Sequence, residues 1–100
     1  MITRFVKMSF QPGKEEDFLA IFNNSCDKIR AFEGCKFLEL LQDNKQSNIF
    51  FTHSKWESED HLNNYRNSEL FQLTWRATKA LFADKPEAWS LKKYGNVIIR

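Results

Sequence analysis

The order of hydrophobic and polar residues predicts a strand and then a helix in the first third of the chain. Residues 2–10 alternate between apolar and polar side chains, the period of two that is typical of a β-strand. From Lys14 onwards the apolar residues follow helical spacing as far as Phe32, and the acidic residues 15–17 suit the first turn of that helix. Gly34 is suited to the stop that follows.

Two more strands and a second helical region come next. Residues 35–42 and 48–56 are rich in apolar, β-branched and aromatic side chains and flank a polar turn, which predicts a β-hairpin. Ser58 is a good N-cap for the next helix. The helical pattern is interrupted at Ser68, which either caps a new helix or marks a kink, and the apolar stripe then continues to Ala83.

The complete order of elements is β-α-β-β-α-β, with residues 88–94 as the fourth strand and residues 95–100 as a short extra strand or a tail. This order predicts a single α+β domain over residues 1–100, with a ferredoxin-like four-stranded antiparallel sheet and both helical regions on one side. Neighbouring large apolar residues, such as Phe5 and Val6, would point to opposite faces of the sheet. Since the helices cover one face, we expect the other face to form a homodimer.

Composition and charge disfavour several classes of protein. The chain has 100 residues, of which 42% are hydrophobic, and a net charge of +2, so it lacks the basic surface of a nucleic-acid-binding domain. The third strand also lacks the aromatic signature of an RNA-recognition domain. No apolar run approaches the roughly 20 residues that span a bilayer. The N-terminal segment has no apolar region typical of a signal peptide, and we therefore expect a cytoplasmic protein without a membrane partner.

The cysteines and histidines form no recognisable motif for a metal or a nucleophile. Cys26 and Cys35 are too few and too far apart in sequence for a disulfide scaffold or a Cys-x-x-Cys site, and we expect both to be reduced. His53 and His61 are the two histidines, and their spacing does not match a pair of zinc ligands. We predict no metal site.

The segment 55–75 contains most of the groups that could bind an aromatic molecule. His61 and Tyr65 are four positions apart and would lie on one face of a helix. Trp75 would approach that face if the helix turns at Ser68. Each of these residues alone could be an ordinary packing or surface residue. Together, beside an aromatic-rich sheet, they predict a flat hydrophobic pocket with one proton acceptor.

Four short motifs lie between residues 2 and 94. They are Phe10-x-Pro12-Gly13 with Glu15, Glu16 and Phe18, then Phe32-Glu33-Gly34-Cys35, then Trp56-Glu-Ser-Glu, and then Tyr65-x-x-Ser68-x-x-Phe71. In these motifs the chain resembles the antibiotic biosynthesis monooxygenase family. The resemblance implies a dimeric α/β barrel in which two ferredoxin-like sheets pack face to face. It also implies one of two activities, either oxygenation of quinols and polycyclic phenols without a cofactor or degradation of haem.

The sequence departs from both active branches of that family. The haem-degrading branch carries an Asn, a Trp and a His at the places where the alignment puts Val6, Tyr65 and Trp75. Phenol-oxygenating members carry an Asn where this chain has His61, and many other members carry a His where Tyr65 stands. We therefore expect that haem is not degraded.

The resemblance and the aromatic segment together predict a monooxygenase that needs no cofactor and acts on a small electron-rich aromatic, such as a quinol or a polyphenol. His61 would be the catalytic base and Tyr65 would orient the substrate as the second catalytic residue. Trp56, Phe71 and Trp75 would bind the substrate. Two alternatives stay open: a non-catalytic dimer that binds a small molecule in the same place, and a protein that binds haem without degrading it.

Overall fold

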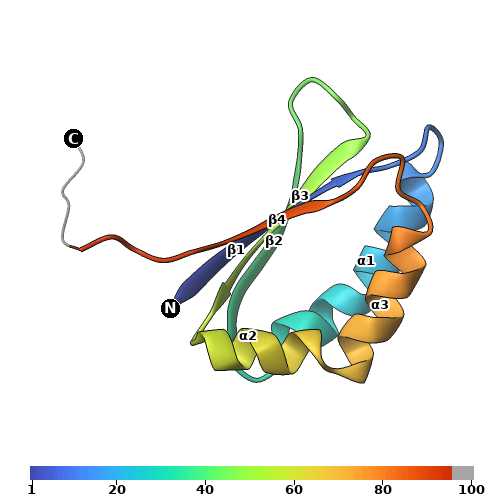
Figure 1. The fold of residues 1–100 in the computed structure, drawn as a ribbon. Coiled ribbons are helices and arrows are strands. Elements are labelled where there is room, and N and C mark those ends of the chain that lie inside the picture. The colour runs from blue at the N-terminus through green and yellow to red at the C-terminus, as the bar shows by residue number, and fades with distance from the viewer. Residues whose placement is uncertain (96–100) are drawn as a thin grey trace.

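The computed structural model describes residues 1–95, which contain four strands and three helices. They are β1 (Ile2–Ser9), α1 (Glu15–Arg30), β2 (Cys35–Gln42), β3 (Ile49–Trp56), α2 (Glu59–Arg66), α3 (Glu69–Lys79) and β4 (Glu87–Leu91). Figure 1 shows the strands as one layer with all three helices on the same side of it. No helix within residues 1–95 is long and apolar enough to cross a membrane.

The four strands form one antiparallel sheet in the order β2-β3-β1-β4. β1 therefore lies between β3 and β4, although it is far from both in sequence. This arrangement, with the helices on one face, confirms the predicted ferredoxin-like fold. Alternation along β1 directs Val6 and Met8 toward the helices, where both contact the core, and directs Phe5 to the outer face, where it stacks on His53.

The second helical region is divided in two at Ser68, as the interrupted sequence pattern indicates. Ser58 Oγ accepts the backbone N–H of His61 at 3.2 Å and starts α2. Ser68 Oγ accepts the backbone N–H of Phe71 at 3.1 Å and starts α3. Each serine satisfies one of the N–H groups that have no partner within the first turn of a helix. The two caps fix the bend between α2 and α3.

Two predicted boundaries differ from the structure by more than two residues. α3 ends at Lys79 rather than near Ala83, because the chain there returns to the sheet, where Ala83 donates its N–H to the carbonyl of Ser9 at 2.8 Å. β4 ends at Leu91, which pairs with Thr3 near the start of β1, so the strand has no partner for the residues that were predicted to extend it to 94. The predicted strand or tail at 95–100 lies, beyond Gly95, outside the described residues.

The core between sheet and helices consists of two separate clusters. One contains the buried residues Met8, Phe10, Phe18 and Phe50, and its Phe10 and Phe18 rings stack at 4.3 Å. The other contains the buried residues Cys35, Trp56 and Leu62. Three of the four buried residues of the first cluster are phenylalanines, which is one use of the high phenylalanine content of the chain.

Gly34 allows the start of β2 to lie against the start of α2. Its φ of +89° is a left-handed conformation that glycine adopts without steric cost. A Cβ at this position would also collide with the His61 side chain. The Gly34 carbonyl accepts the N–H of Glu57 at 2.8 Å, which ties this turn to the end of β3.

The outer face of the sheet carries a row of four residues, one from each strand. Glu39, His53, Phe5 and Trp89 are neighbours across β2, β3, β1 and β4. The Phe5 and His53 rings stack at 4.5 Å, and His53 Nδ1 lies 2.9 Å from Glu39 Oε1. Trp89 remains 43% exposed. An aromatic row with an exposed tryptophan fits the predicted sheet-to-sheet dimer, which stays a prediction.

Candidate functional site

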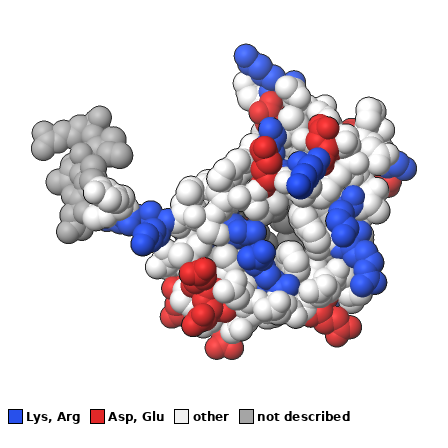
Figure 2. All heavy atoms as spheres, in the orientation of Figure 1, with Lys and Arg blue, Asp and Glu red and all other residues white. Residues whose placement is uncertain are grey.

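A cavity of about 300 Å³ lies between the sheet and the helices. It is lined by residues of all four strands and all three helices, and both core clusters contribute to its walls. Figure 2 shows the surface hollowed near its middle, with basic side chains beside the hollow. This volume is at the lower end of the range of about 300–1,000 Å³ for small-molecule sites, so the cavity suits a small ligand.

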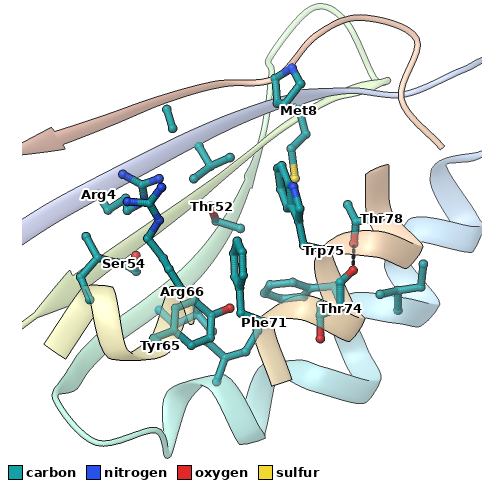
Figure 3. Close-up of a pocket in the computed structure, with 18 of the residues that line it drawn as sticks. Arg4, Met8, Thr52, Ser54, Tyr65, Arg66, Phe71, Thr74, Trp75 and Thr78 are labelled. Carbon is teal, nitrogen blue, oxygen red and sulfur yellow. Dashed lines mark hydrogen bonds between the residues drawn. The ribbon is translucent and has the colours of Figure 1, made fainter. Parts of the chain in front are cut away.

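One wall of the cavity is a continuous line of four aromatic rings. The Trp56 and Tyr65 rings stack with centroids 4.8 Å apart, and Tyr65 meets Phe71 edge to face at 5.3 Å. Phe71 and Trp75 then stack at 5.8 Å with only 11° between their planes. All four residues line the cavity, and Figure 3 shows Trp75 reaching toward Met8 on the sheet. The structure thus brings together four of the five site residues predicted from sequence.

Local structure holds these rings in place. Trp56 is the last residue of β3 and is 1% exposed, and its indole N–H donates to Ser54 Oγ at 3.0 Å. Tyr65 belongs to the last turn of α2, and Phe71 lies in the first turn of α3. The caps at the start of α2 and α3 therefore set the angle at which the wall bends, because they fix where each helix begins.

The fifth predicted residue, His61, does not line the cavity. Its Nδ1 lies 2.7 Å from Ser58 Oγ, and its Nε2 lies 3.7 Å from a carboxylate oxygen of Glu57. The imidazole folds back over the start of α2 and the Gly34 turn. The four-residue spacing correctly placed His61 and Tyr65 on one helix, but it could not show that the serine cap would hold the imidazole. The geometry therefore gives His61 a structural place and does not support its predicted role as the base.

Two arginines that the sequence analysis did not select give the cavity a charged end. Arg4 lies on β1 and Arg66 in the last turn of α2, and both line the cavity (Figure 3). Arg4 Nη1 donates to Ser90 Oγ at 2.8 Å. Burial, and then the nearby charge of Arg66, lower the pKa of Arg4, while Tyr65 acts in the opposite direction. The sequence does mark Arg4 as a candidate site residue, because it is the one charged residue on the otherwise apolar face of β1.

The Tyr65 hydroxyl is a hydrogen-bond donor rather than a base. Burial raises the pKa of Tyr65 well above its ordinary value, Cys35 raises it further, and Arg4 partly offsets both effects. The phenol is therefore neutral at physiological pH. Among the side chains of residues 1–95, none forms a hydrogen bond with this hydroxyl, so it is free to donate to a ligand.

The remaining polar side chains of the lining are few. Thr78 donates its hydroxyl to the carbonyl of Thr74 at 2.8 Å, within α3 (Figure 3). Glu87, on β4, is the carboxylate of the lining, and it is exposed to solvent. Within residues 1–95 no group of three His, Cys, Asp or Glu side chains could hold a metal ion. The described lining contains no histidine.

The fold and the cavity define a class of small ferredoxin-like proteins with an aromatic site between sheet and helices. The sequence model of the antibiotic biosynthesis monooxygenase family matches residues 1–77. The chain therefore belongs to the antibiotic biosynthesis monooxygenase family, as its motifs predicted.

Solved structures share this fold over nearly the whole chain. One described as an antibiotic biosynthesis monooxygenase has a TM-score of 0.88 at 16% identity, covering 94% of this chain and 99% of its own. A conserved protein of Methanosarcina mazei Go1 has a TM-score of 0.88 at 19% identity, covering 94% of each chain. A Pseudomonas aeruginosa protein has a TM-score of 0.82 at 23% identity, also covering 94% of each. No curated protein matches the sequence. At these identities the likeness concerns the fold.

Proposed function

We propose that this protein is a cofactor-independent monooxygenase that acts on a small electron-rich aromatic, such as a quinol. The observation that carries the proposal is the wall of four aromatic rings along an apolar cavity of about 300 Å³. A flat ring can lie against such a wall through stacking and edge-to-face contacts. Membership of the monooxygenase family supports the same assignment.

In the proposed reaction the substrate itself supplies all the electrons. A quinol that has lost a phenolic proton gives one electron to O2, and the resulting aryloxyl radical and superoxide combine at a ring carbon to form a hydroperoxide. This carbon loses its hydrogen as the O–O bond breaks, so that quinol and O2 give a hydroxyquinone and one water. The protein's part is to hold the ring, exclude bulk water and favour the anion.

Proton removal is assigned to solvent that enters the cavity. Tyr65 is neutral because burial raises its pKa, so it orients the substrate oxygen as a donor. The two arginines are cations and accept no proton. Trp56, Phe71 and Trp75 act by contact with the ring.

Oxygen uptake by purified protein tests this function. A panel of one-ring and two-ring quinols is supplied with a metal chelator and without flavin, and uptake above the protein-free rate is expected. Trp75→Leu should raise KM by about tenfold through lost ring contact, with a smaller effect on kcat. Leu73→Ala is the control, because Leu73 is on the same helix, 54% exposed and outside the lining. Uptake that never exceeds the protein-free rate contradicts the proposal.

A non-catalytic binding module is the second candidate function. The observation in its favour is that the described lining contains neither histidine nor lysine, so no uncharged nitrogen base is present there to take the phenolic proton. A module of this kind would bind the same quinols, seen as quenching of Trp56 and Trp75 fluorescence, without accelerating their oxidation. Binding and turnover measured on one preparation separate the two functions.

A further inference from the structure

Arg4 and Arg66 form a positively charged end of the cavity, beside Tyr65 and away from Met8 and Trp75. Figure 3 shows their guanidinium groups at one end of the site and Met8 and Trp75 at the other. The two arginines come from different elements, β1 and α2, and the charge of Arg66 is close enough to lower the pKa of Arg4. Arg4 is half-buried and Arg66 is exposed. A half-buried cation beside a second cation costs free energy unless an anion is bound there.

Neither guanidinium has an anionic partner among the described residues. The Ser90 hydroxyl accepts a hydrogen bond from Arg4 but carries no charge. Within residues 1–95 no carboxylate lies within 4.0 Å of either arginine. The cavity's own carboxylate, Glu87, is three residues before Ser90 on β4, which is about 10 Å along a strand. The charged end therefore keeps unused donors for a ligand.

Two titratable groups near this end, Tyr65 and Cys35, are uncharged at physiological pH. Tyr65 lies on α2 next to Arg66, and burial keeps its phenol neutral. Cys35 on β2 lies close to Tyr65, and burial raises the pKa of its thiol. An anionic oxygen placed here would meet two cations and one phenolic donor, and Glu87 is the one acidic residue of the described lining.

We propose that the cavity binds its aromatic ligand as a phenolate, with the anionic oxygen at Arg4 and Arg66 and the ring against the aromatic wall. This inference rests on the proposed function and names the ionisation state in which the substrate is held. Charge-assisted hydrogen bonds from guanidinium groups are short and strong, particularly away from bulk water. By favouring the anion, the arginines activate the ring toward O2 without a strong base in the cavity.

A nitrophenol probe tests this without any turnover. The absorption of 4-nitrophenol moves to longer wavelength when it loses its proton, so its pKa can be measured free and bound. An opposite charge nearby lowers a pKa by about 1 to 3, and the bound probe should titrate at least about 1 pH unit below the free probe. By linkage this is about tenfold tighter binding of the anion than of the neutral form.

The variants identify the arginines as the cause. Arg4→Gln should abolish most of the preference for the anion, Arg4→Lys should restore part of it, and Arg76→Gln should leave it unchanged. Arg76 is an exposed arginine of α3 outside the cavity lining, so its removal changes the net charge equally. If Arg4→Gln does not fold, Arg66→Gln at the exposed end of α2 replaces it.

The outcomes separate this proposal from the enzymatic one. 4-Nitroanisole has a similar shape but cannot ionise, and it should bind the parent and Arg4→Gln equally. A bound nitrophenol whose pKa equals or exceeds that of the free probe overturns the proposal, as does an equal loss in Arg76→Gln. Failure of both probes to bind contradicts the cavity as the aromatic site. Phenolate preference without oxygen uptake keeps this inference and rejects the monooxygenase.

Discussion

The indole of Trp56 stacks on the phenol of Tyr65, with ring centroids 4.8 Å apart and 23° between the planes. This contact joins the last residue of β3 to the last turn of α2. It belongs to the second core cluster and also forms the start of the cavity wall. Stability and ligand binding therefore depend on the same pair of rings.

The ring of Tyr65, rather than its hydroxyl, should stabilise the fold. Tyr65→Ala removes contacts with Trp56, Phe32 and Phe71 and should lower the free energy of unfolding by about 3 kcal/mol. Tyr65→Phe keeps the ring and should change the free energy of unfolding by less than about 0.5 kcal/mol, because the hydroxyl forms no hydrogen bond with a described residue. Urea unfolding measures both, and equal losses would contradict this division.

Alkaline pH should destabilise the protein through Tyr65. Its pKa is raised on folding, so above the ordinary tyrosine pKa of about 10 the unfolded chain loses this proton while the folded chain keeps it. The stabilisation is complete below about pH 10 and is lost as pH rises above that value. Cys35, whose pKa burial also raises, acts in the same direction from about pH 8.5.

Tyr65→Phe provides the control for this pH dependence. Urea midpoints measured between pH 8 and 11 should fall less steeply in Tyr65→Phe than in the parent, since phenylalanine has no proton to lose. Tyr94, which is 87% exposed, supplies a matched comparison, and Tyr94→Phe should follow the parent. Identical slopes in all three proteins would exclude Tyr65 as the source.

His61 should matter for stability and not for the chemical step. Its imidazole hydrogen-bonds to the Ser58 cap and packs against Gly34, so His61→Ala should cost roughly 1 kcal/mol of unfolding free energy. The kcat of the His61→Ala variant for quinol oxidation should equal that of the parent protein within about twofold. Loss of a general base costs about 10²- to 10⁴-fold. A decrease of that size in a folded His61→Ala variant would restore this residue as the base.

The outer row of the sheet should be buried in a homodimer. Exposed Trp89 and Leu91 lie on this face beside Phe5, and charges of both signs, such as Lys7 and Glu39, let the face pair with a copy of itself. Light scattering behind a sizing column should give twice the mass of the chain. Trp89→Glu and Phe5→Glu should each shift the measured mass toward that of the monomer. Trp89→Glu is the variant more certain to fold, because Trp89 is exposed.

Leu73→Glu is the control for the dimer prediction. Leu73 is 54% exposed on α3, on the helix side of the molecule, so a charge there should leave the mass unchanged. A parent protein that is monomeric at micromolar concentration would contradict the sheet-to-sheet dimer. Equal dissociation by Leu73→Glu would place the interface on the helices instead.

Haem should remain intact in the presence of this protein and a reductant. Neither His53 nor His61 lines the cavity, so no described lining residue offers an imidazole to the iron. The absorption band of haem should decay no faster than in a protein-free control. Ring opening with release of iron would contradict this prediction.

Periodicity was sufficient to predict the fold because each element carries its own signal. β2 has the predicted bounds. Ser58, predicted as an N-cap, starts α2, and Ser68, predicted as a cap or a kink, starts α3. The end of β4 was not predictable, since it depends on where β1 begins in the assembled sheet.

The candidate site was predictable in its rings and not in its charges. Trp56, Tyr65, Phe71 and Trp75 follow from aromatic residues placed near one helix face. His61 lies outside the lining, because its imidazole is held by the hydroxyl of Ser58, three residues earlier, which helical spacing alone does not show. Arg4 and Arg66 come from β1 and α2, which are distant in sequence, and only the assembled fold brings them to one cavity.

The most direct test of the proposed chemistry is the origin of the oxygen in the product. A quinol is incubated with the protein under ¹⁸O2 in the presence of a chelator, and the product is analysed by mass spectrometry together with a peroxide assay. We predict a hydroxyquinone that carries one ¹⁸O atom per turnover, formed with water and without hydrogen peroxide. A product free of ¹⁸O that appears with one equivalent of peroxide, or no product above the protein-free control, would contradict a monooxygenase.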